Sequence, residues 1–303
     1  MSTVQRNRAP GPASAGDRLK SYLLAPLPQH LLSRTVLWLT RRRSALVTPV
    51  VRRFARAFDV QMADAVEPDL AHYDTFNAFF TRALRPEARP ITREPGGIAC
   101  PADGRVSSLG RVQDARVLQA KGCDYALSDL LGGDEEAVER LRHGSFVTVY
   151  LSPRDYHRLH MPLEGTLRRQ THVPGRLWSV GQHAVRAIDG LFTRNERVIA
   201  QFDTEAGRMA LVLVGAINVA AIETVWHGLV TPPVKSALSH RDYDADTGAD
   251  EPVRLQRGEE MGRFNMGSTI IALFERPIDF DPALDSESPV RMGQLLGTVT
   301  PHE

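Results

Sequence analysis

The stretch VIAQFDTEAGRMALVLV, residues 198–214, contains two apolar runs that are separated by a polar turn sequence with Asp and Gly. Short runs of β-branched and aliphatic residues bounded in this way are typical of strands. Further runs of the same kind lie at Phe146–Leu151, Val219–Glu223 and Thr269–Phe274. Since they do not alternate regularly with helical segments, the pattern predicts an α+β fold with mainly antiparallel sheets.

The N-terminal part of the chain has a different character. Residues 1–18 are rich in Ala, Pro, Gly, Ser and Arg and lack periodic apolar positions, which predicts a disordered N-terminus. Apolar residues then recur at helical spacing in two segments, near residues 31–39 and 50–62. We therefore expect an amphipathic helical region at residues 19–70 and a main domain at residues 71–303. Residues 239–256 read as a polar surface loop.

Charge is distributed unevenly along the chain. Residues 1–60 carry eleven Arg or Lys and two Asp, a net charge of +9, whereas the rest of the chain has a net charge of −8. In the second helical segment, Arg52, Arg53 and Arg56 lie opposite an apolar arc. The pattern fits a helix in a membrane interface, where each cation contributes about 1 kcal/mol, and equally fits a helix packed on the domain. Nucleic acid is a less suitable partner, because aromatic residues at stacking positions and known binding motifs are absent.

Composition excludes several classes of protein. The chain has 303 residues, of which 42% are hydrophobic and 24% charged, as in a folded protein of one large or two small domains. Cys100 and Cys123 cannot form a disulfide framework and lack metal-binding spacing, which indicates a reducing compartment and no structural zinc. We expect neither a membrane span nor secretion, because an 18-residue apolar run and a signal-peptide pattern are absent.

Three segments place small or reactive residues beside expected strands. They are PADG (101–104), YLSPRDYHRLHMP (150–162) and GEEMGRFNMGSTIIALF (258–274). Taken singly, each has an ordinary explanation: Asp103 suits a turn, and His157 and His160 suit structural or solvent-facing positions. Their HxxH spacing lacks a third ligand, so we predict no metal site.

Taken together, the segments offer the residue types that activate a hydroxyl. His160 supplies a base, Asp103 a carboxylate and Ser268 a nucleophile. A GxSxG motif is absent, which disfavours an ordinary α/β-hydrolase. Because Gly267 precedes Ser268, the backbone there is permissive enough for Ser268 to attack its own preceding carbonyl.

Six stretches together give the chain a resemblance to phosphatidylserine decarboxylases of the bacterial membrane-associated type. The matching stretches are FNAFFTRALRPEARPI (76–91), PADG (101–104), YLSPRDYHRLHMP (150–162), FTRNERV (192–198), VGAINVAAIET (214–224) and GEEMGRFNMGST (258–269). They cover nearly everything after residue 70, in the family's order. The family usually has Leu where this chain has Met266, a substitution that conserves size and apolarity.

The resemblance implies a proenzyme that cleaves itself between Gly267 and Ser268. It assigns His160 as the general base on Ser268 and Asp103 as the carboxylate that orients and charges the imidazole. Cleavage would give a β-chain of residues 1–267 and an α-chain of residues 268–303. Ser268 would become a pyruvoyl group, so no external cofactor is needed.

The resemblance also implies the substrate, partners and location. The pyruvoyl group would form a Schiff base with phosphatidylserine, release CO2 and yield phosphatidylethanolamine. His157 or His160 would bind the carboxylate or return the proton. The two cleavage products would stay together, as a homodimer of cleaved protomers, peripherally bound to the cytoplasmic face of the cell membrane.

Two other interpretations remain open at this point. One is a lipid-directed serine hydrolase that uses an intact Ser268 with His160 and Asp103. The other is a non-catalytic lipid-binding relative, which would keep the basic helices and stay uncut. Whether the chain is cleaved separates all three.

Overall fold

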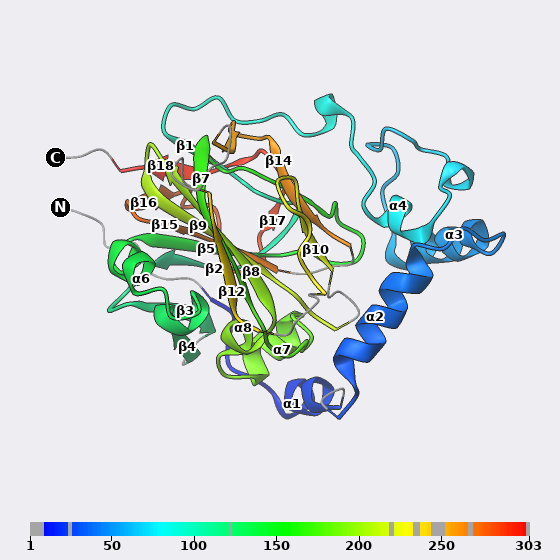
Figure 1. The fold of residues 1–303 in the computed structure, drawn as a ribbon, viewed down its shortest axis with the longest axis horizontal. Helices are drawn as coiled ribbons and strands as arrows, with labels where there is room; N and C mark the ends of the chain where they lie inside the picture. Colours follow the sequence, from blue (N-terminus) through cyan, green and yellow to red (C-terminus); the bar gives the residue numbers. More distant parts are fainter. Residues whose placement is uncertain are drawn as a thin grey trace.

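A large antiparallel sheet forms the centre of the computed structural model (Figure 1). The structure describes residues 9–23, 26–120, 123–217, 221–232, 237–243, 252–265 and 269–300. In spatial order, the strands described in this sheet are β12 (Ser239–Asp242), β7 (Gly165–Val173), β8 (Arg197–Thr204), β9 (Gly207–Val214), β15 (Thr269–Phe274), β5 (Ser145–Tyr150), β2 (Gly104–Arg111) and β17 (Pro289–Val290), and β13 (Arg254–Leu255) pairs with β7.

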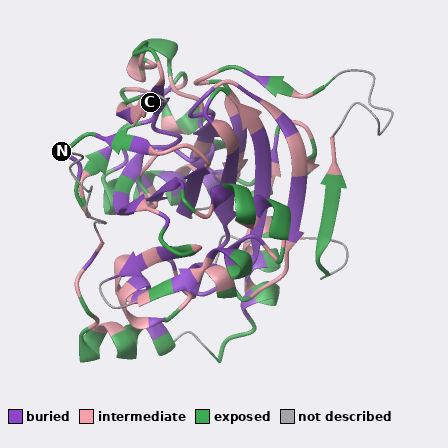
Figure 2. Ribbon diagram, turned by 90° about the vertical axis from the view of Figure 1, so that its left-hand side faces the viewer, coloured by how far each residue is buried: buried purple, intermediate pink, exposed green. Residues whose placement is uncertain are grey.

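Both faces of this sheet are buried at its centre (Figure 2). All six residues of β15 are buried: Ile270, Ala272 and Phe274 join one hydrophobic cluster, and Ile271 and Leu273 join another. Because successive side chains of a strand point to opposite faces, burial on both faces requires a continuous apolar run. This explains why the strands expected at residues 146–151, 198–202, 209–214 and 269–274 are confirmed.

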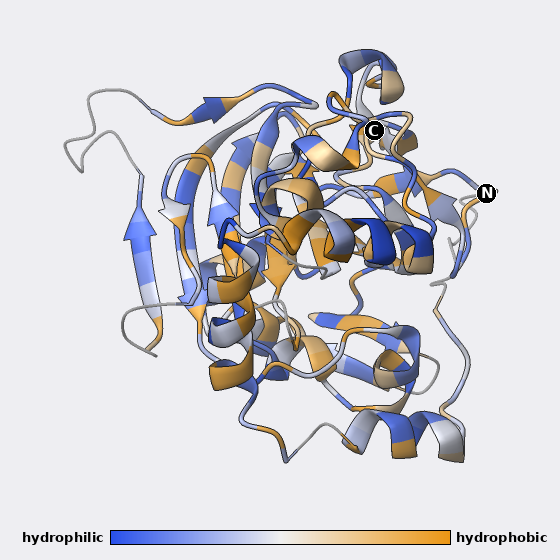
Figure 3. Ribbon diagram, turned by 90° about the vertical axis from the view of Figure 1, so that its right-hand side faces the viewer, coloured by the Kyte–Doolittle hydropathy of each residue, from blue (hydrophilic) through white to orange (hydrophobic). Residues whose placement is uncertain are grey.

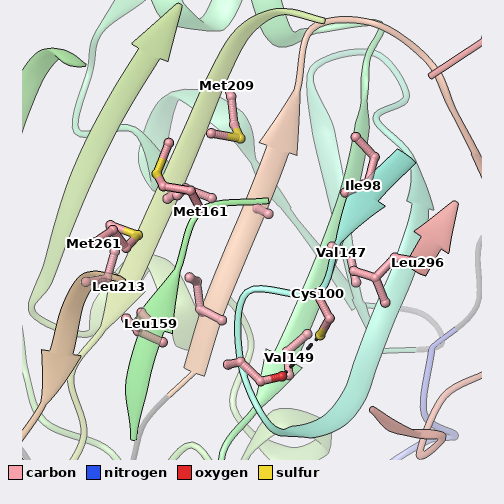
Figure 4. Packing of buried hydrophobic residues seen from close by; sticks show 14 of the residues in the cluster. Ile98, Cys100, Val147, Val149, Leu159, Met161, Met209, Leu213, Met261 and Leu296 are labelled. Carbon is pink, nitrogen blue, oxygen red and sulfur yellow. Dashed lines mark hydrogen bonds between the residues drawn. The ribbon is translucent and has the colours of Figure 1, made fainter. Parts of the chain in front are cut away.

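Two smaller antiparallel sheets cover the first face. One consists of β6 (Arg158–His160), β14 (Glu260–Phe264), β10 (Ile222–Thr224) and β11 (Gly228–Leu229), and the other of β1 (Gly97–Ala99), β18 (Leu295–Val299) and β16 (Ile278–Phe280). Met161, Met209 and Met261 fill the layer between the first of these sheets and the central sheet (Figure 4). Flexible Met side chains suit such an irregular gap.

Short helices and a hairpin cover the second face. They are α5 (Leu127–Leu130), α6 (Glu135–Leu141), α7 (Gln182–Ala187), α8 (Leu191–Arg194), β3 (Arg116–Ala120) and β4 (Cys123–Ala126). Among the described residues, the pairings between the named strands are all antiparallel, and the helices are short. The expected α+β class is therefore confirmed.

The N-terminal region forms a helical arm along one side of the sheets (Figure 1). It contains α1 (Ala15–Tyr22), α2 (Gln29–Thr40), α3 (Val47–Phe58), η1 (Leu70–His72), α4 (Phe76–Phe80) and η2 (Pro86–Ala88). The helices α2 and α3 agree with the two predicted segments. In the part of the chain that the structure describes, no helix is long and apolar enough to cross a bilayer.

The expected disorder of residues 1–18 is wrong for its last residues. The Ser14 side chain accepts a hydrogen bond from the Asp17 N–H at 3.1 Å, and Asp17 accepts one from the Ser14 N–H at 3.0 Å, which caps α1. Asp17 also pairs with Arg186 of α7 at 3.0 Å. Composition alone overlooked the local Ser-x-x-Asp capping pattern, and the contact with the distant Arg186 could not be read from it. Residues 1–8 lie outside the described part.

The apolar arc of α3 is only partly covered. Val51 and Ala55 are buried against a cluster that includes Phe79 and Phe80, whereas Val50 and Phe58 are 50% and 43% exposed. Figure 3 views the molecule from the side that carries this helix. The helix therefore packs on the domain through one half of its arc and leaves the other half to solvent.

The prediction of a loop at residues 239–256 is wrong at both ends. The strands β12 and β13 from this segment pair with β7, with His240 opposite Thr171 and Arg254 opposite Thr166. Backbone pairing at a sheet edge tolerates polar, exposed side chains, so the composition resembles that of a loop. Residues 244–251 lie outside the described part.

Candidate active site

Backbone pairing brings the three candidate segments together. The His160 N–H donates to the Pro101 carbonyl at 2.9 Å, which joins the turn that carries Asp103 to β6. The strand β6 also pairs with β14, which leads toward the Gly267–Ser268 bond. On the other side of that bond, Thr269 of β15 pairs with Tyr150.

The ring of His160 is held in one orientation by two hydrogen bonds. Its Nδ1 donates to the Gly258 carbonyl at 2.8 Å, and the Tyr156 hydroxyl donates to its Nε2 at 3.1 Å. A carbonyl can only accept, which assigns the proton to Nδ1 and the lone pair to Nε2. Burial lowers the pKa of His160 below its ordinary value, against smaller opposing effects that include the charge of Asp103. The side chain is therefore a neutral base at neutral pH.

Asp103 is bound to other partners. Its carboxylate accepts from Arg89 Nε at 2.9 and 3.0 Å and from the Met292 N–H at 2.8 Å. Arg89 also contacts Asp64 at 2.9 Å, and although burial opposes it, these carboxylates raise the pKa of Arg89 above its ordinary value. The expectation that Asp103 orients the His160 ring is thus corrected, because Gly258 makes that contact. The guanidinium of Arg89 is charged and bidentate, so it binds the Asp103 carboxylate more strongly than the neutral imidazole of His160 would.

His157 lies close by and is fully buried. Its Nδ1 donates to the Asp155 carbonyl at 2.8 Å, and its ring centre lies 4.1 Å from that of Phe80. Its Nε2 has no hydrogen-bond partner among the described residues. Burial lowers the pKa of His157 to about 3, so Nε2 keeps an unused lone pair at neutral pH. Its assigned role stays a prediction.

The predicted cleavage residues Met266, Gly267 and Ser268 lie outside the described residues, and only the chain on either side of them can be placed. Thr269 is fully buried and pairs with Tyr150 and Val214, so the C-terminal flank is fixed in the middle of the central sheet. The N-terminal flank ends at Asn265, which is also buried.

A cavity of about 250 Å³ adjoins the candidate residue Asp103 and Tyr156, the hydrogen-bond partner of His160. Arg82 lies on its wall with only 5% of its surface exposed. It donates to the Arg154 carbonyl at 3.1 Å, and among the described residues no carboxylate lies within ion-pair distance of it. A buried cation without a counter-ion is costly, which suits a cavity that receives an anionic group. Within the described ranges, no group of three or more His, Cys, Asp or Glu residues is placed to hold a metal ion.

Sequence reasoning missed Arg89, Tyr156 and Arg82. All three fall in the stretches FNAFFTRALRPEARPI and YLSPRDYHRLHMP, so the segments were found without the individual contacts. The contacts depend on which side chains meet across the fold, and the one-dimensional pattern carries no such information.

Comparison with known proteins gives a consistent result. The sequence model of the family described as phosphatidylserine decarboxylase matches residues 76–298, and a second one, described as PSD, matches residues 19–59. A protein of Alkalilimnicola ehrlichii named phosphatidylserine decarboxylase proenzyme is 51% identical over 271 residues, which is 88% of this chain and 91% of the relative. Proteins of the same name from Pseudomonas aeruginosa (strain LESB58) and Bordetella pertussis are 52% and 50% identical, over 89% and 92% of this chain and 93% of each relative.

Proposed function

The chain belongs to the phosphatidylserine decarboxylase family, and we propose that it cleaves itself between Gly267 and Ser268 and then converts phosphatidylserine to phosphatidylethanolamine and CO2. One observation carries the proposal for this chain. His160 is a buried, neutral base, and its Nε2 lone pair accepts a hydrogen bond from the hydroxyl of Tyr156, so it is able to accept a proton from a hydroxyl. The test is CO2 release from phosphatidylserine micelles by purified protein without added pyridoxal phosphate. A protein that releases none contradicts the proposal.

Maturation would begin with proton transfer from the Ser268 hydroxyl to His160 Nε2, which at present accepts the Tyr156 hydroxyl. The Ser268 oxygen attacks the carbonyl carbon of Gly267, and the amide C–N bond breaks as its nitrogen gains a proton, leaving an ester. Loss of the Ser268 α-proton then expels the Gly267 carboxylate and leaves dehydroalanine. Hydrolysis of its imine form releases ammonia and leaves a pyruvoyl group.

In the mature enzyme, the pyruvoyl group would supply an electron sink through a Schiff base with the serine amine of the lipid. The chain's own side chains would hold the headgroup and return a proton after CO2 leaves. His157 and His160 are the candidates for that step, and either ring would first take up a proton at its Nε2 lone pair and then donate it to the substrate carbon. Thr269 would follow the new chain end directly. Its Oγ1 is buried without a hydrogen-bond partner among the described residues, so its hydroxyl would be able to donate to a carbonyl oxygen of the pyruvoyl group.

The charged side chains around the cavity beside Asp103 support a substrate headgroup that carries both negative and positive groups. The wall of this cavity carries charges of both signs, five arginines (Arg82, Arg89, Arg105, Arg154 and Arg291) and four aspartates (Asp59, Asp64, Asp103 and Asp155). Phosphate and carboxylate groups would give the buried Arg82 the counter-ion that the described residues do not supply.

The two cleavage products would remain associated. Residues 268–303 include β15, which lies between β5 and β9, and also β17 and β18, which pair with β2 and β1. Because β15 is paired on both sides and buried on both faces, its dissociation would expose the hydrophobic core to water. The homodimer of cleaved protomers stays a prediction from the resemblance.

A peripheral position on the cytoplasmic face of an anionic membrane is part of the proposal. It is supported by large apolar side chains that are exposed along the helical arm, whereas few are exposed on the sheets. Those on the arm are Leu19, Tyr22, Leu23, Leu27, Leu31, Trp38, Leu39, Leu46, Val50 and Phe58. Exposed apolar residues on basic, amphipathic helices are typical of interfacial binding.

Reversing Arg52, Arg53 and Arg56 to Glu should weaken binding to vesicles that contain phosphatidylserine. All three side chains are exposed on α3, and at about 1 kcal/mol for each cation the loss is on the order of 100-fold. Vesicle co-sedimentation measures it. The matched control reverses three exposed arginines of the main domain, Arg93, Arg194 and Arg241. Equal binding by both triple variants would contradict the proposed orientation.

Asp103→Asn should slow self-cleavage by about 10-fold, because its charge raises the pKa of His160 and stabilises the imidazolium that forms during proton transfer. The control is Asp64→Asn, which removes the other carboxylate bound to Arg89. Cleavage over time in a cell-free translation reaction gives the rates. If Asp64→Asn slows cleavage as much as Asp103→Asn, Asp103 acts only by holding Arg89.

A further inference from the structure

Asn265 closes the N-terminal flank of the cleavage motif. It is 1% exposed and is the last described residue before Gly267 and Ser268. Its backbone N–H donates to the Ala221 carbonyl at 2.9 Å, one position beyond the last pair of β10 and β14. Its side-chain Nδ2 donates to the same carbonyl at 3.2 Å. The side chain therefore adds to the pairing where the regular ladder ends.

The free oxygen of this amide binds a residue of the helical arm. Asn77 Nδ2 donates to Asn265 Oδ1 at 3.0 Å across 188 positions of sequence. Asn77 belongs to α4, whose first turn is capped by the Thr75 side chain, which accepts from the Ala78 N–H at 3.1 Å. The Thr81 hydroxyl and N–H both donate to the Asn77 carbonyl at 2.9 Å. Asn77 is thus held at a fixed place before it meets Asn265.

The arm is itself anchored on the strands around the site. Arg158 Nε donates to the Thr81 carbonyl at 2.9 Å, immediately after α4. Glu223 of β10 accepts from Asn265 Nδ2 at 3.4 Å and lies 3.8 Å from Arg41 at the end of α2. The N-terminal flank of the scissile bond is consequently held by the small sheet and, through Asn77, by the helical arm, whereas the C-terminal flank is held by the central sheet.

We propose that Asn77 is a positioning residue for self-cleavage, which acts by fixing Asn265 on the β-chain side of the Gly267–Ser268 bond. The inference rests on the proposed self-cleavage. Attack of a hydroxyl on the preceding carbonyl requires both flanks to be held, and a misplacement of about 1 Å at a reacting centre costs on the order of 100-fold in rate.

Self-cleavage and decarboxylation should differ in how much they depend on the contact between Asn77 and Asn265. Once the bond is broken, Asn265 belongs to the end of the β-chain, whereas the reactive group sits on the α-chain, which β15 holds. Loss of the Asn77 contact should therefore slow the cleavage step, while CO2 release per cleaved molecule stays close to the wild-type value. A defect in general folding would impair both.

The test measures cleavage rates of full-length Asn77→Ala, Asn265→Ala and the double variant by intact mass after cell-free synthesis. We expect each single variant to cleave 10- to 100-fold more slowly and the double variant to be no slower than the slower single variant. Asn77→Asp keeps the side-chain shape but presents an oxygen to Asn265 Oδ1, so it should also cleave slowly without creating a cavity.

Tyr73→Phe is the matched control, because it removes a hydrogen bond of the helical arm, from the Tyr73 hydroxyl to the Glu67 carbonyl at 2.6 Å, and leaves both the hydrogen bonds of α4 and the Asn77–Asn265 contact in place. Melting temperatures in an uncleavable Ser268→Ala background report stability apart from cleavage. Wild-type cleavage by Asn77→Ala and Asn77→Asp, multiplicative rates in the double variant, or equal slowing by Tyr73→Phe would each overturn the inference. An uncleaved wild-type chain would instead contradict the proposed function.

Discussion

Ser268→Ala is expected to give a single chain that never separates into two pieces and releases no CO2 from phosphatidylserine. Cleavage needs a hydroxyl that attacks the Gly267 carbonyl, and the ketone forms only after the elimination that expels the same oxygen with the Gly267 carboxylate. Both reactions therefore stop together, and no partial activity is expected. Intact-mass analysis and a CO2 assay on the same preparation measure the two losses.

Ser286→Ala serves as the control for this variant, since it removes a hydroxyl elsewhere in the α-chain. It should cleave and decarboxylate as the wild type does. Cleavage of Ser268→Ala at the same position would show that another group attacks the backbone. A wild-type chain that stays whole and is acylated at Ser268 would favour the serine hydrolase, and one that stays whole and inert would favour a lipid-binding relative.

His160→Ala should slow self-cleavage by about 10²- to 10⁴-fold, the usual contribution of a positioned general base. The buried imidazole has its proton on Nδ1, fixed by the Gly258 carbonyl, and its lone pair on Nε2. Time courses of cleavage after synthesis give the rate. His143→Ala, which changes an exposed histidine, should behave as the wild type. Full-speed cleavage of His160→Ala would remove this residue from the mechanism.

The pH dependence of wild-type cleavage follows from the same side chain. Burial lowers the pKa of His160, so the ring stays neutral to a lower pH than a solvent-exposed histidine. The rate should accordingly be flat above the ordinary histidine pKa of 6.5 and fall only as the pH drops through the lowered value. A rate that already falls between pH 8 and 7 would indicate a different base.

The strands at the centre could be predicted from the sequence because of where they lie. Residues of β9 and β15 are buried on both faces of the sheet, and this environment demands uninterrupted apolar runs. The helices α2 and α3 were predictable for the related reason that they are apolar on one side. Patterns of this kind report burial, so they reveal the elements that build the core.

Elements held by distant polar contacts could not be predicted in this way. An ion pair between Asp17 and Arg186 joins the helix α1 to α7, and β12 is formed by backbone pairing at the edge of the sheet. The candidate site shows the same difference between residues that the sequence reveals and contacts that only the fold reveals. The candidate residues Asp103 and His160 were found by their motifs, but their partners Arg89 and Gly258 are determined by competition among groups that meet only in the fold.

The central claim is that the protein breaks its own backbone and converts a serine into a ketone. Intact-mass spectrometry of freshly purified wild-type protein, with and without borohydride and phosphatidylserine, tests it most directly. The account predicts chains of residues 1–267 and 268–303, the shorter one lighter than its serine form by the mass of ammonia and carrying the lipid after reduction. A single 33.5 kDa chain that traps no lipid would contradict it.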